Sequence, residues 1–142
     1  MCPERERSAR ATTTWLLALV AVATLAAPSP LRAQTGDFTV DFSWEGTAAC
    51  FDPKSPPFSL SGVPAGTQRL TFAMKDLDAP SFPHGGGTVA FSGQTQVGRD
   101  AFSYKGPCPP SGQHTYQWTV EAQDQAGKTL ATATVAKKFP PR

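Results

Sequence analysis

The sequence contains few of the residues on which catalytic and metal sites depend. Its 142 residues include two histidines and three cysteines, and only 17% of the residues are charged. It has no Cys-x-x-Cys spacing, no phosphate-binding or dinucleotide-binding glycine motif, and no Gly-x-Ser-x-Gly turn around a nucleophile. We therefore expect no metal ion and no cofactor, and the sequence favours a binding protein over an enzyme.

The sequence also lacks a hydrophobic run long enough to cross a membrane. The uncharged stretch from Trp15 to Ala26 is shorter than the roughly 20 residues that a spanning helix needs. It follows several arginines and precedes small residues, a pattern typical of a secretory signal peptide. We expect residues 1–33 to be a leader that is cleaved after Ala33, with Ala27 as the second choice and an uncleaved anchor as the alternative. The protein is then exported, to the periplasm or the cell exterior, and does not span the membrane after cleavage.

The remaining chain has no excess charge of either sign. Residues 34–142 carry nine basic and nine acidic side chains, so the net charge of +2 belongs to the leader. Proteins that bind nucleic acids usually show clustered lysines and arginines, and no such cluster occurs here. A nucleic-acid partner is not expected.

Only two cysteines lie beyond the leader, Cys50 and Cys108. An even number of cysteines in an exported protein favours a disulfide, because exported proteins meet an oxidising environment. The alternative is a reactive thiol or a metal ligand, but neither cysteine has a second one nearby. We predict that Cys50 and Cys108 are bonded to each other.

Alternation of apolar and polar residues predicts an all-β domain over residues 34–142. In residues 37–44, for example, Phe38, Val40, Phe42 and Trp44 share one face, as in a half-buried strand. Proline- and glycine-rich stretches at 52–57, 63–66, 83–87 and 106–112 are typical of turns. Outside the leader no stretch has a helical period. The expected strands are 37–44, 68–76, 88–91, 113–123 and 129–135, packed as a sandwich.

Four polar residues are candidates for a site. His114 shares a strand face with Tyr116, so it is either a hydrogen-bonded core residue or part of a site. His84 lies between a proline and three glycines, which is typical of an exposed loop. Asp76 and Asp78 end a strand and point to the same side if the strand persists, although aspartate is also common in turns.

Five sequence blocks occur in one order and resemble the phosphatidylethanolamine-binding protein family, in particular its bacterial Raf-kinase-inhibitor-like branch. The blocks are Ser55-Pro56-Pro57, Val63-Pro64-Ala65-Gly66-Thr67, Asp76-Leu77-Asp78-Ala79-Pro80, a following histidine, and Gly106-Pro107-Cys108-Pro109-Pro110 with His114 and Tyr116. The resemblance covers roughly residues 44–123. It implies a Greek-key β-sandwich, here without the C-terminal helix that covers the pocket in some relatives.

The resemblance also implies a small pocket for an anionic ligand, such as phosphate or a phospholipid head group. The residues that match the family's pocket are Asp76, Asp78, Pro80, His84, Gly106, Pro107, His114 and Tyr116. Imidazole and phenol groups and the amides of a glycine-rich loop can all donate hydrogen bonds to phosphate oxygens. An imidazole that gains a proton as the pH falls would add attraction for an anion.

Other functions remain open on the sequence. The same surface can serve as a protein-interaction module that inhibits a protease or another partner outside the cytoplasm, or the domain can be purely structural. The His84-Gly85-Gly86-Gly87 segment resembles part of an esterase oxyanion hole but lacks the rest of that motif. A metal held by two imidazoles and a carboxylate has no supporting spacing.

Overall fold

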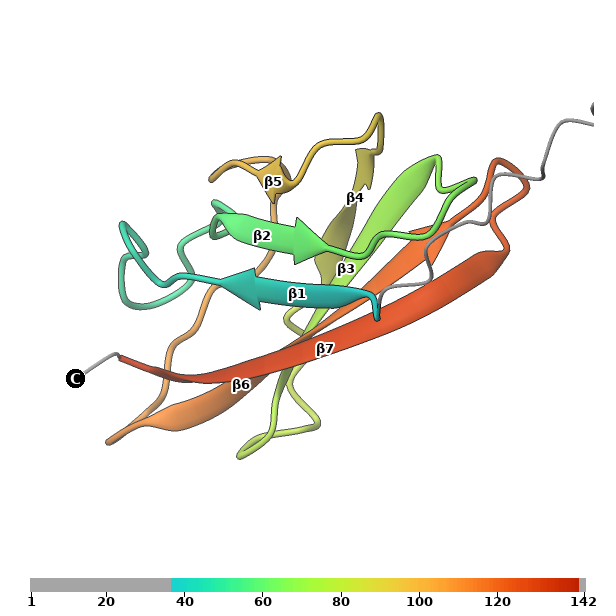
Figure 1. The fold of residues 1–142 in the computed structure, drawn as a ribbon. Coiled ribbons are helices and arrows are strands. Elements are labelled where there is room, and N and C mark those ends of the chain that lie inside the picture. The colour runs from blue at the N-terminus through green and yellow to red at the C-terminus, as the bar shows by residue number, and fades with distance from the viewer. Residues whose placement is uncertain (1–36, 141–142) are drawn as a thin grey trace, which may run out of the picture. The chain divides into compact units, whose positions relative to one another are not determined.

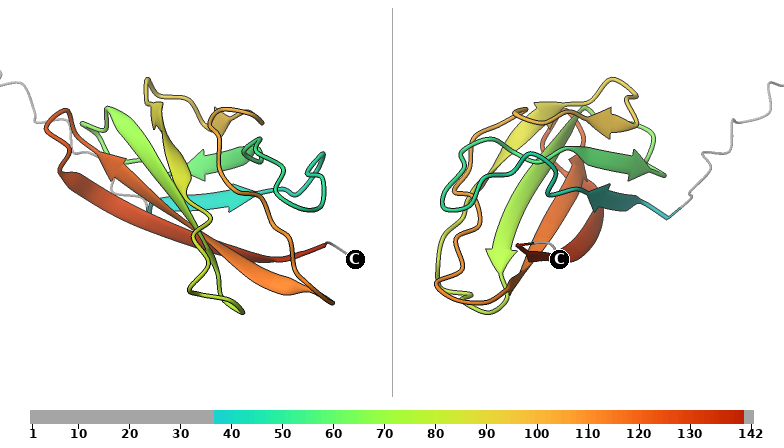
Figure 2. Two further views of the ribbon diagram at one scale, coloured as in Figure 1. Left: turned by 180° about the vertical axis from the view of Figure 1, so that it is seen from behind. Right: turned by 90° about the vertical axis from the view of Figure 1, so that its left-hand side faces the viewer.

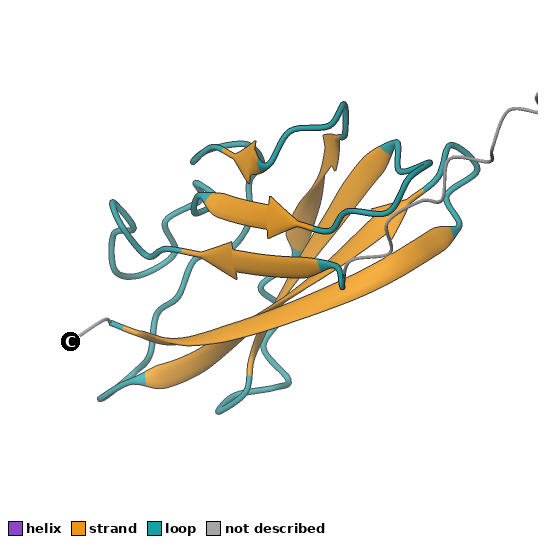
Figure 3. Cartoon of the chain, in the orientation of Figure 1, coloured by secondary structure: helices purple, strands orange, loops and turns teal. Residues whose placement is uncertain are grey.

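A computed structural model describes residues 37–140, and the predicted leader lies outside these residues. Within this range the chain forms two antiparallel sheets and no helix (Figure 3), so the expectation of a mainly β fold is confirmed. No membrane-crossing helix occurs between residues 37 and 140. The first sheet contains β1 (Thr39–Phe42), β2 (Phe58–Ser61) and β5 (Gln96–Val97). The second contains β3 (Arg69–Asp76), β4 (Gly86–Ala90), β6 (His114–Gln123) and β7 (Thr129–Phe139).

The chain passes repeatedly between the two sheets (Figure 1). The first sheet has the order β1-β2-β5 and the second the order β4-β3-β6-β7. After β4 the chain visits β5 in the other sheet and then returns as β6 beside β3, as expected for a Greek-key connection. Figure 2 shows that the short strands of the first sheet lie across the long strands of the second.

The core between the sheets is rich in aromatic side chains. Phe58 of β2 packs on Phe72 of β3, with ring centroids 4.7 Å apart, and edge-on against Trp118 of β6 at 5.2 Å. Rings in such tilted and edge-on arrangements attract one another in addition to the area that they bury. Because these three rings come from both sheets, they hold the two layers together.

The predicted strands agree with the structure over most of their length, with four differences. The first strand is shorter than expected, because β1 covers only Thr39–Phe42 of residues 37–44. The β2 and β5 strands were not predicted, because Phe58–Ser61 is short and flanked by prolines and Gln96–Val97 is shorter still. The β4 strand starts at Gly86, inside a stretch expected to be a turn. The β7 strand continues to Phe139, beyond the predicted end at Val135.

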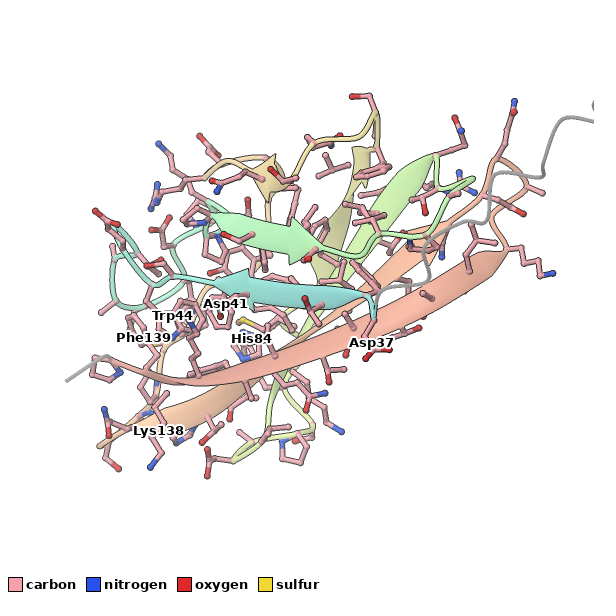
Figure 4. All side chains as sticks on the ribbon, viewed as in Figure 1. Asp37, Asp41, Trp44, His84, Lys138 and Phe139 are labelled. Atoms are coloured by element: carbon pink, nitrogen blue, oxygen red, sulfur yellow. A yellow bond between two sulfur atoms is a disulfide. The ribbon has the colours of Figure 1, made fainter. Side chains whose placement is uncertain are left out.

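The extra length of β7 places its end against β1. The Lys137 ammonium donates a hydrogen bond to the carbonyl oxygen of Phe42 and forms an ion pair with Asp41 at 2.8 Å. The next buried residue along β7 is Phe139, whose ring centroid lies 5.2 Å from that of Trp44. Figure 4 shows both side chains at the same end of the domain. These contacts come from residues distant in sequence, which is why the alternation pattern did not reveal them.

Cys50 and Cys108 form the predicted disulfide, with their Cα atoms 4.1 Å apart. The bond joins the loop before β2 to the loop before β6. It therefore closes a long stretch of the chain and fixes two loops at one end of the sandwich.

Candidate functional site

The buried rows of two neighbouring strands end in polar residues. Along β3 the inward row runs through Leu70, Phe72 and Met74 and ends at Asp76. The β6 strand runs the opposite way and its inward row begins with His114 and Tyr116. Asp76 is the direct partner of Tyr116, so His114 lies diagonally across from it. The antiparallel pairing thus gathers three polar side chains where the apolar core stops.

The Asp76 carboxylate is almost fully buried and has hydrogen bonds on both oxygens. Its Oδ1 accepts from the backbone amides of Asp78 at 2.8 Å and Ala79 at 3.1 Å, and its Oδ2 lies 2.7 Å from Nδ1 of His114. Burial alone would raise the pKa of Asp76. The hydrogen bonds from His114 and from the two amides outweigh burial and hold that pKa below its ordinary value. Asp76 is therefore ionised at neutral pH and orients the His114 ring.

His84 is buried, with only 3% of its surface exposed, although the sequence predicted an exposed loop residue. Its Nδ1 lies 2.6 Å from the carbonyl oxygen of Lys105, and its own carbonyl accepts a hydrogen bond from the Lys105 amide. The ring packs against Phe82 at 4.7 Å and meets the Tyr116 ring edge-on at 5.4 Å. Figure 4 shows the side chain in the interior of the domain. These contacts, all distant in sequence except Phe82, explain the burial.

The glycines after His84 serve packing. A Cβ atom on Gly86 would overlap the carbonyl of Phe72, and one on Gly87 would overlap the Phe102 ring. Both glycines lie in β4 and pair with β3. Their role is the close approach of a strand and an aromatic ring, so the likeness to an oxyanion-hole segment has a structural explanation.

Tyr116 has a buried hydroxyl without a hydrogen-bond partner among the described residues. The ring is fully buried and lies between two imidazoles, edge-on to His84 and stacked on His114 at 6.3 Å. Burial, together with the nearby charge of Asp76, raises the pKa of Tyr116 to about 12. The hydroxyl therefore keeps its proton and is available as a donor.

These residues surround a cavity of about 140 Å³. Four of the eight pocket residues predicted from the sequence line it, namely Asp76, His84, His114 and Tyr116. Both histidines use Nδ1 for the bonds described above, and neither Nε2 makes a hydrogen bond within residues 37–140. Among the polar side-chain groups of the lining residues, the two imidazole Nε2 atoms and the Tyr116 phenol are thus the ones without a hydrogen bond within residues 37–140.

The other four predicted pocket residues do not line this cavity. The Asp78 carboxylate accepts a hydrogen bond from the Thr115 amide at 2.6 Å and so joins the loop to β6. Pro80 lies in the exposed loop after β3. Pro107 is fully buried, and a Cβ on Gly106 would lie 2.5 Å from the Asp52 carbonyl oxygen. Gly106 and Pro107 thus pack against the loop before β2, where the Pro107 carbonyl accepts a hydrogen bond from the Cys50 amide.

The apolar part of the lining was not predicted from the sequence, and neither was the position of Cys108 there. The apolar residues are Phe51, Ala79, Phe82 and Pro110. Phe82 lies two residues before His84, so its closeness in sequence to a predicted pocket residue could have indicated that it lines the pocket. Phe51 had none, because it has a left-handed backbone with φ of 62°, which a bulky residue rarely adopts.

The residues that could bind a metal ion at this site have few free ligand atoms. Ligand atoms of Asp76, Asp78 and His114 lie within 4.8 Å of one another. However, both oxygens of Asp76, Oδ2 of Asp78 and Nδ1 of His114 already take part in hydrogen bonds. A metal at this point would have to replace those bonds, so the donor set fits it poorly.

The fold and the site together define a two-sheet β-sandwich with a small pocket, lined by polar and apolar residues, where its central strands end. Comparison with known proteins shows a similarity to one family. Residues 83–139 match the model of the phosphatidylethanolamine-binding protein family. A UPF0098 protein from Methanothermobacter thermautotrophicus is 32% identical over 91 residues, which are 49% of this chain and 60% of that protein. The C-terminal part of the chain is thus similar to the phosphatidylethanolamine-binding protein family.

Two solved structures share the fold. Escherichia coli YbcL, described as a member of the mammalian family of these proteins, matches with a TM-score of 0.56 and 20% identity, over 75% of this chain and all of its own. A phosphatidylethanolamine-binding protein homologue from Chlamydia trachomatis also has a TM-score of 0.56, with 18% identity, over 74% of this chain and 98% of its own. At these identities the likeness concerns the fold alone.

Proposed function

We propose that this chain is an exported binding protein whose pocket takes a small anionic group, such as inorganic phosphate or the phosphate of a phospholipid head group. The observation that carries the proposal is the buried Tyr116 hydroxyl, which has no hydrogen-bond partner within residues 37–140 and belongs to a residue that lines the same cavity as His84 and His114. Leaving a buried polar group unpaired is costly, and a ligand oxygen would relieve that cost.

The hydrogen-bonding groups of the pocket favour an anion once the imidazoles carry a proton. Each Nδ1 donates, to the Lys105 carbonyl from His84 and to the Asp76 carboxylate from His114. A protonated Nε2 on either ring can therefore donate to the ligand, and so can the Tyr116 hydroxyl. The negative charge of Asp76 costs the anion some attraction.

A binding role is favoured over catalysis by the kinds of residue in the lining. The cavity has no serine, threonine or free cysteine, since Cys108 is in the disulfide. Its imidazoles thus have no hydroxyl or thiol beside them to activate as a nucleophile. Inhibition of a protease or another protein remains the alternative proposal, with the exposed rings of Phe51 and Phe82 as the surface for such a partner.

The test is a titration with inorganic phosphate and with phosphoethanolamine, following the two imidazole signals by NMR. We expect both signals to move together and to saturate, and we expect His114→Ala to remove the response. Vesicles that contain phosphatidylethanolamine separate a lipid head group from a free anion as the source of the phosphate. Signals that stay unchanged at millimolar ligand would rule out the anion pocket and favour the protein-partner alternative.

Export has its own test. The expected leader should be absent from the protein purified from the host, and sequencing of its N-terminus should begin at Gln34. Fractionation of the cells should recover the protein in the periplasm or the medium. A protein that retains Met1 in the cytoplasm would contradict this part of the proposal.

A further inference from the structure

The loop before β2 has an unusual backbone next to the pocket. Cys50 and Phe51 are consecutive and both have positive φ angles, of 61° and 62°. Neither is a glycine, so this conformation is unfavourable for both and must be imposed by the surroundings. Such strain, when it lies beside a site, points to a functional reason for the conformation.

Phe51 has little packing of its own to hold it there. Its side chain is 52% exposed and lies outside the buried core. Its one aromatic contact is with Phe82, whose ring is stacked on it at 5.9 Å and is itself 38% exposed. A side chain with so few contacts would leave this position readily if its backbone were free to relax.

What fixes the backbone is the connection to the loop before β6. The disulfide joins Cys50 to Cys108, and the Cys50 amide donates a hydrogen bond to the Pro107 carbonyl at 3.1 Å. On the other side of Phe51, the Asp52 carboxylate accepts from the amides of Ala48 and Lys54. The disulfide is the single covalent link in this set.

The disulfide is directly connected to the lining of the pocket. Cys108 and Phe51 both line the cavity, and Phe51 directly follows the bonded Cys50. Breaking the bond would therefore release the wall that Phe51 forms and leave the polar wall of His84, His114 and Tyr116 in place. Water would then enter from that side and weaken every hydrogen bond between the pocket and a charged ligand.

We propose that the Cys50–Cys108 disulfide positions the ligand pocket: it holds Phe51 over the cavity and keeps the site closed enough to bind an anion tightly. This inference rests on the proposed function. It assigns the disulfide a role in binding that is separate from its contribution to stability. It also makes the affinity for the anion depend on the oxidation state of the two cysteines.

The experiment compares phosphate affinity in the oxidised protein and after reduction by dithiothreitol. Two electrons and two protons convert the disulfide to two thiols, and dithiothreitol leaves as its cyclic disulfide. We expect the affinity to fall roughly fivefold or more, as for any contact of ordinary strength in binding. Circular dichroism and tryptophan fluorescence confirm that the reduced protein is still folded.

Phe51→Ala with the disulfide intact should lower the affinity to a similar extent. Reduction of that variant should lower it little further, because both changes remove the same wall and their effects are not additive. Leu130→Ala is the control, since it shortens an exposed apolar side chain, 37% exposed, at the opposite end of the β6–β7 hairpin. If the disulfide serves stability alone, its reduction would lower the melting temperature and leave the phosphate affinity unchanged.

The outcomes separate the two proposals. Equal phosphate affinity in the oxidised and reduced proteins would overturn the role of the disulfide and leave the anion pocket standing. Failure of the oxidised protein to bind phosphate would overturn both. If the reduced chain unfolds, Phe51→Ala decides alone, and unchanged affinity in that variant would overturn the inference.

Discussion

Asp76 and His114 form a partly buried pair in which the carboxylate Oδ2 lies 2.7 Å from Nδ1 of the imidazole. Asp76 ends β3 and His114 begins β6, so the pair lies where the core gives way to the pocket. The carboxylate fixes which nitrogen of the ring carries the donated proton. The other nitrogen, Nε2, is then left free to interact with a ligand.

Replacing Asp76 by asparagine should lower the free energy of unfolding at neutral pH by about 1–3 kcal/mol, because charged hydrogen bonds are lost in a buried place. The pKa of Asp76 is held below its ordinary value in the folded state. Its contribution is therefore complete above the ordinary carboxyl range and is lost as the pH falls through the lowered value.

Denaturant unfolding at several pH values checks this. The difference between the wild type and Asp76→Asn should shrink as the solution becomes strongly acidic. Asp37→Asn, at an exposed position, is the control and should change stability by less than about 0.5 kcal/mol. A difference that stayed constant down to the lowest pH would show that the charge of Asp76 contributes nothing.

Removing the Tyr116 hydroxyl should separate stability from binding. The hydroxyl is buried and has no hydrogen-bond partner in the described part of the chain, so Tyr116→Phe should leave the free energy of unfolding unchanged or raise it slightly. The same change should weaken phosphate binding several-fold, because a donor to the ligand is lost. Thermal unfolding and calorimetric titration of the same two proteins provide both values. Loss of stability without loss of affinity would argue against a donor role.

Much of the site was visible in the sequence because it lies on regular strands. Alternation placed His114 on the face of Tyr116, and it put Asp76 at the end of another strand. Only the strand order was needed to bring these ends together, and the family resemblance implied it. The local pattern and the global fold agree here, which is where reasoning from sequence works best.

His84 and Phe51 show where that reasoning stopped. A histidine before three glycines reads as a loop residue, yet contacts with Lys105 and Tyr116 bury it. Phe51 is placed by a left-handed backbone and a disulfide, neither of which leaves a local pattern in the sequence. The Gly86-Gly87 pair likewise reads as a turn, although both residues belong to β4 and are small because β3 and Phe102 are close.

The glycines of β4 provide a test of the packing around the pocket. Gly86→Ala should lower the free energy of unfolding by at least about 2 kcal/mol, since the added methyl would meet the backbone carbonyl of Phe72, which cannot move aside without disturbing β3. Gly98→Ala is the matched control: a Cβ there meets nothing within 4 Å, and its backbone is not left-handed. Denaturant unfolding compares the two.

Because His84 is two residues before Gly86, a strained β4 should also disturb the His84 imidazole signal. A tolerated Gly86→Ala, with stability and the His84 signal unchanged, would show that β4 can move away from β3 and that the glycines are not needed to place the histidine.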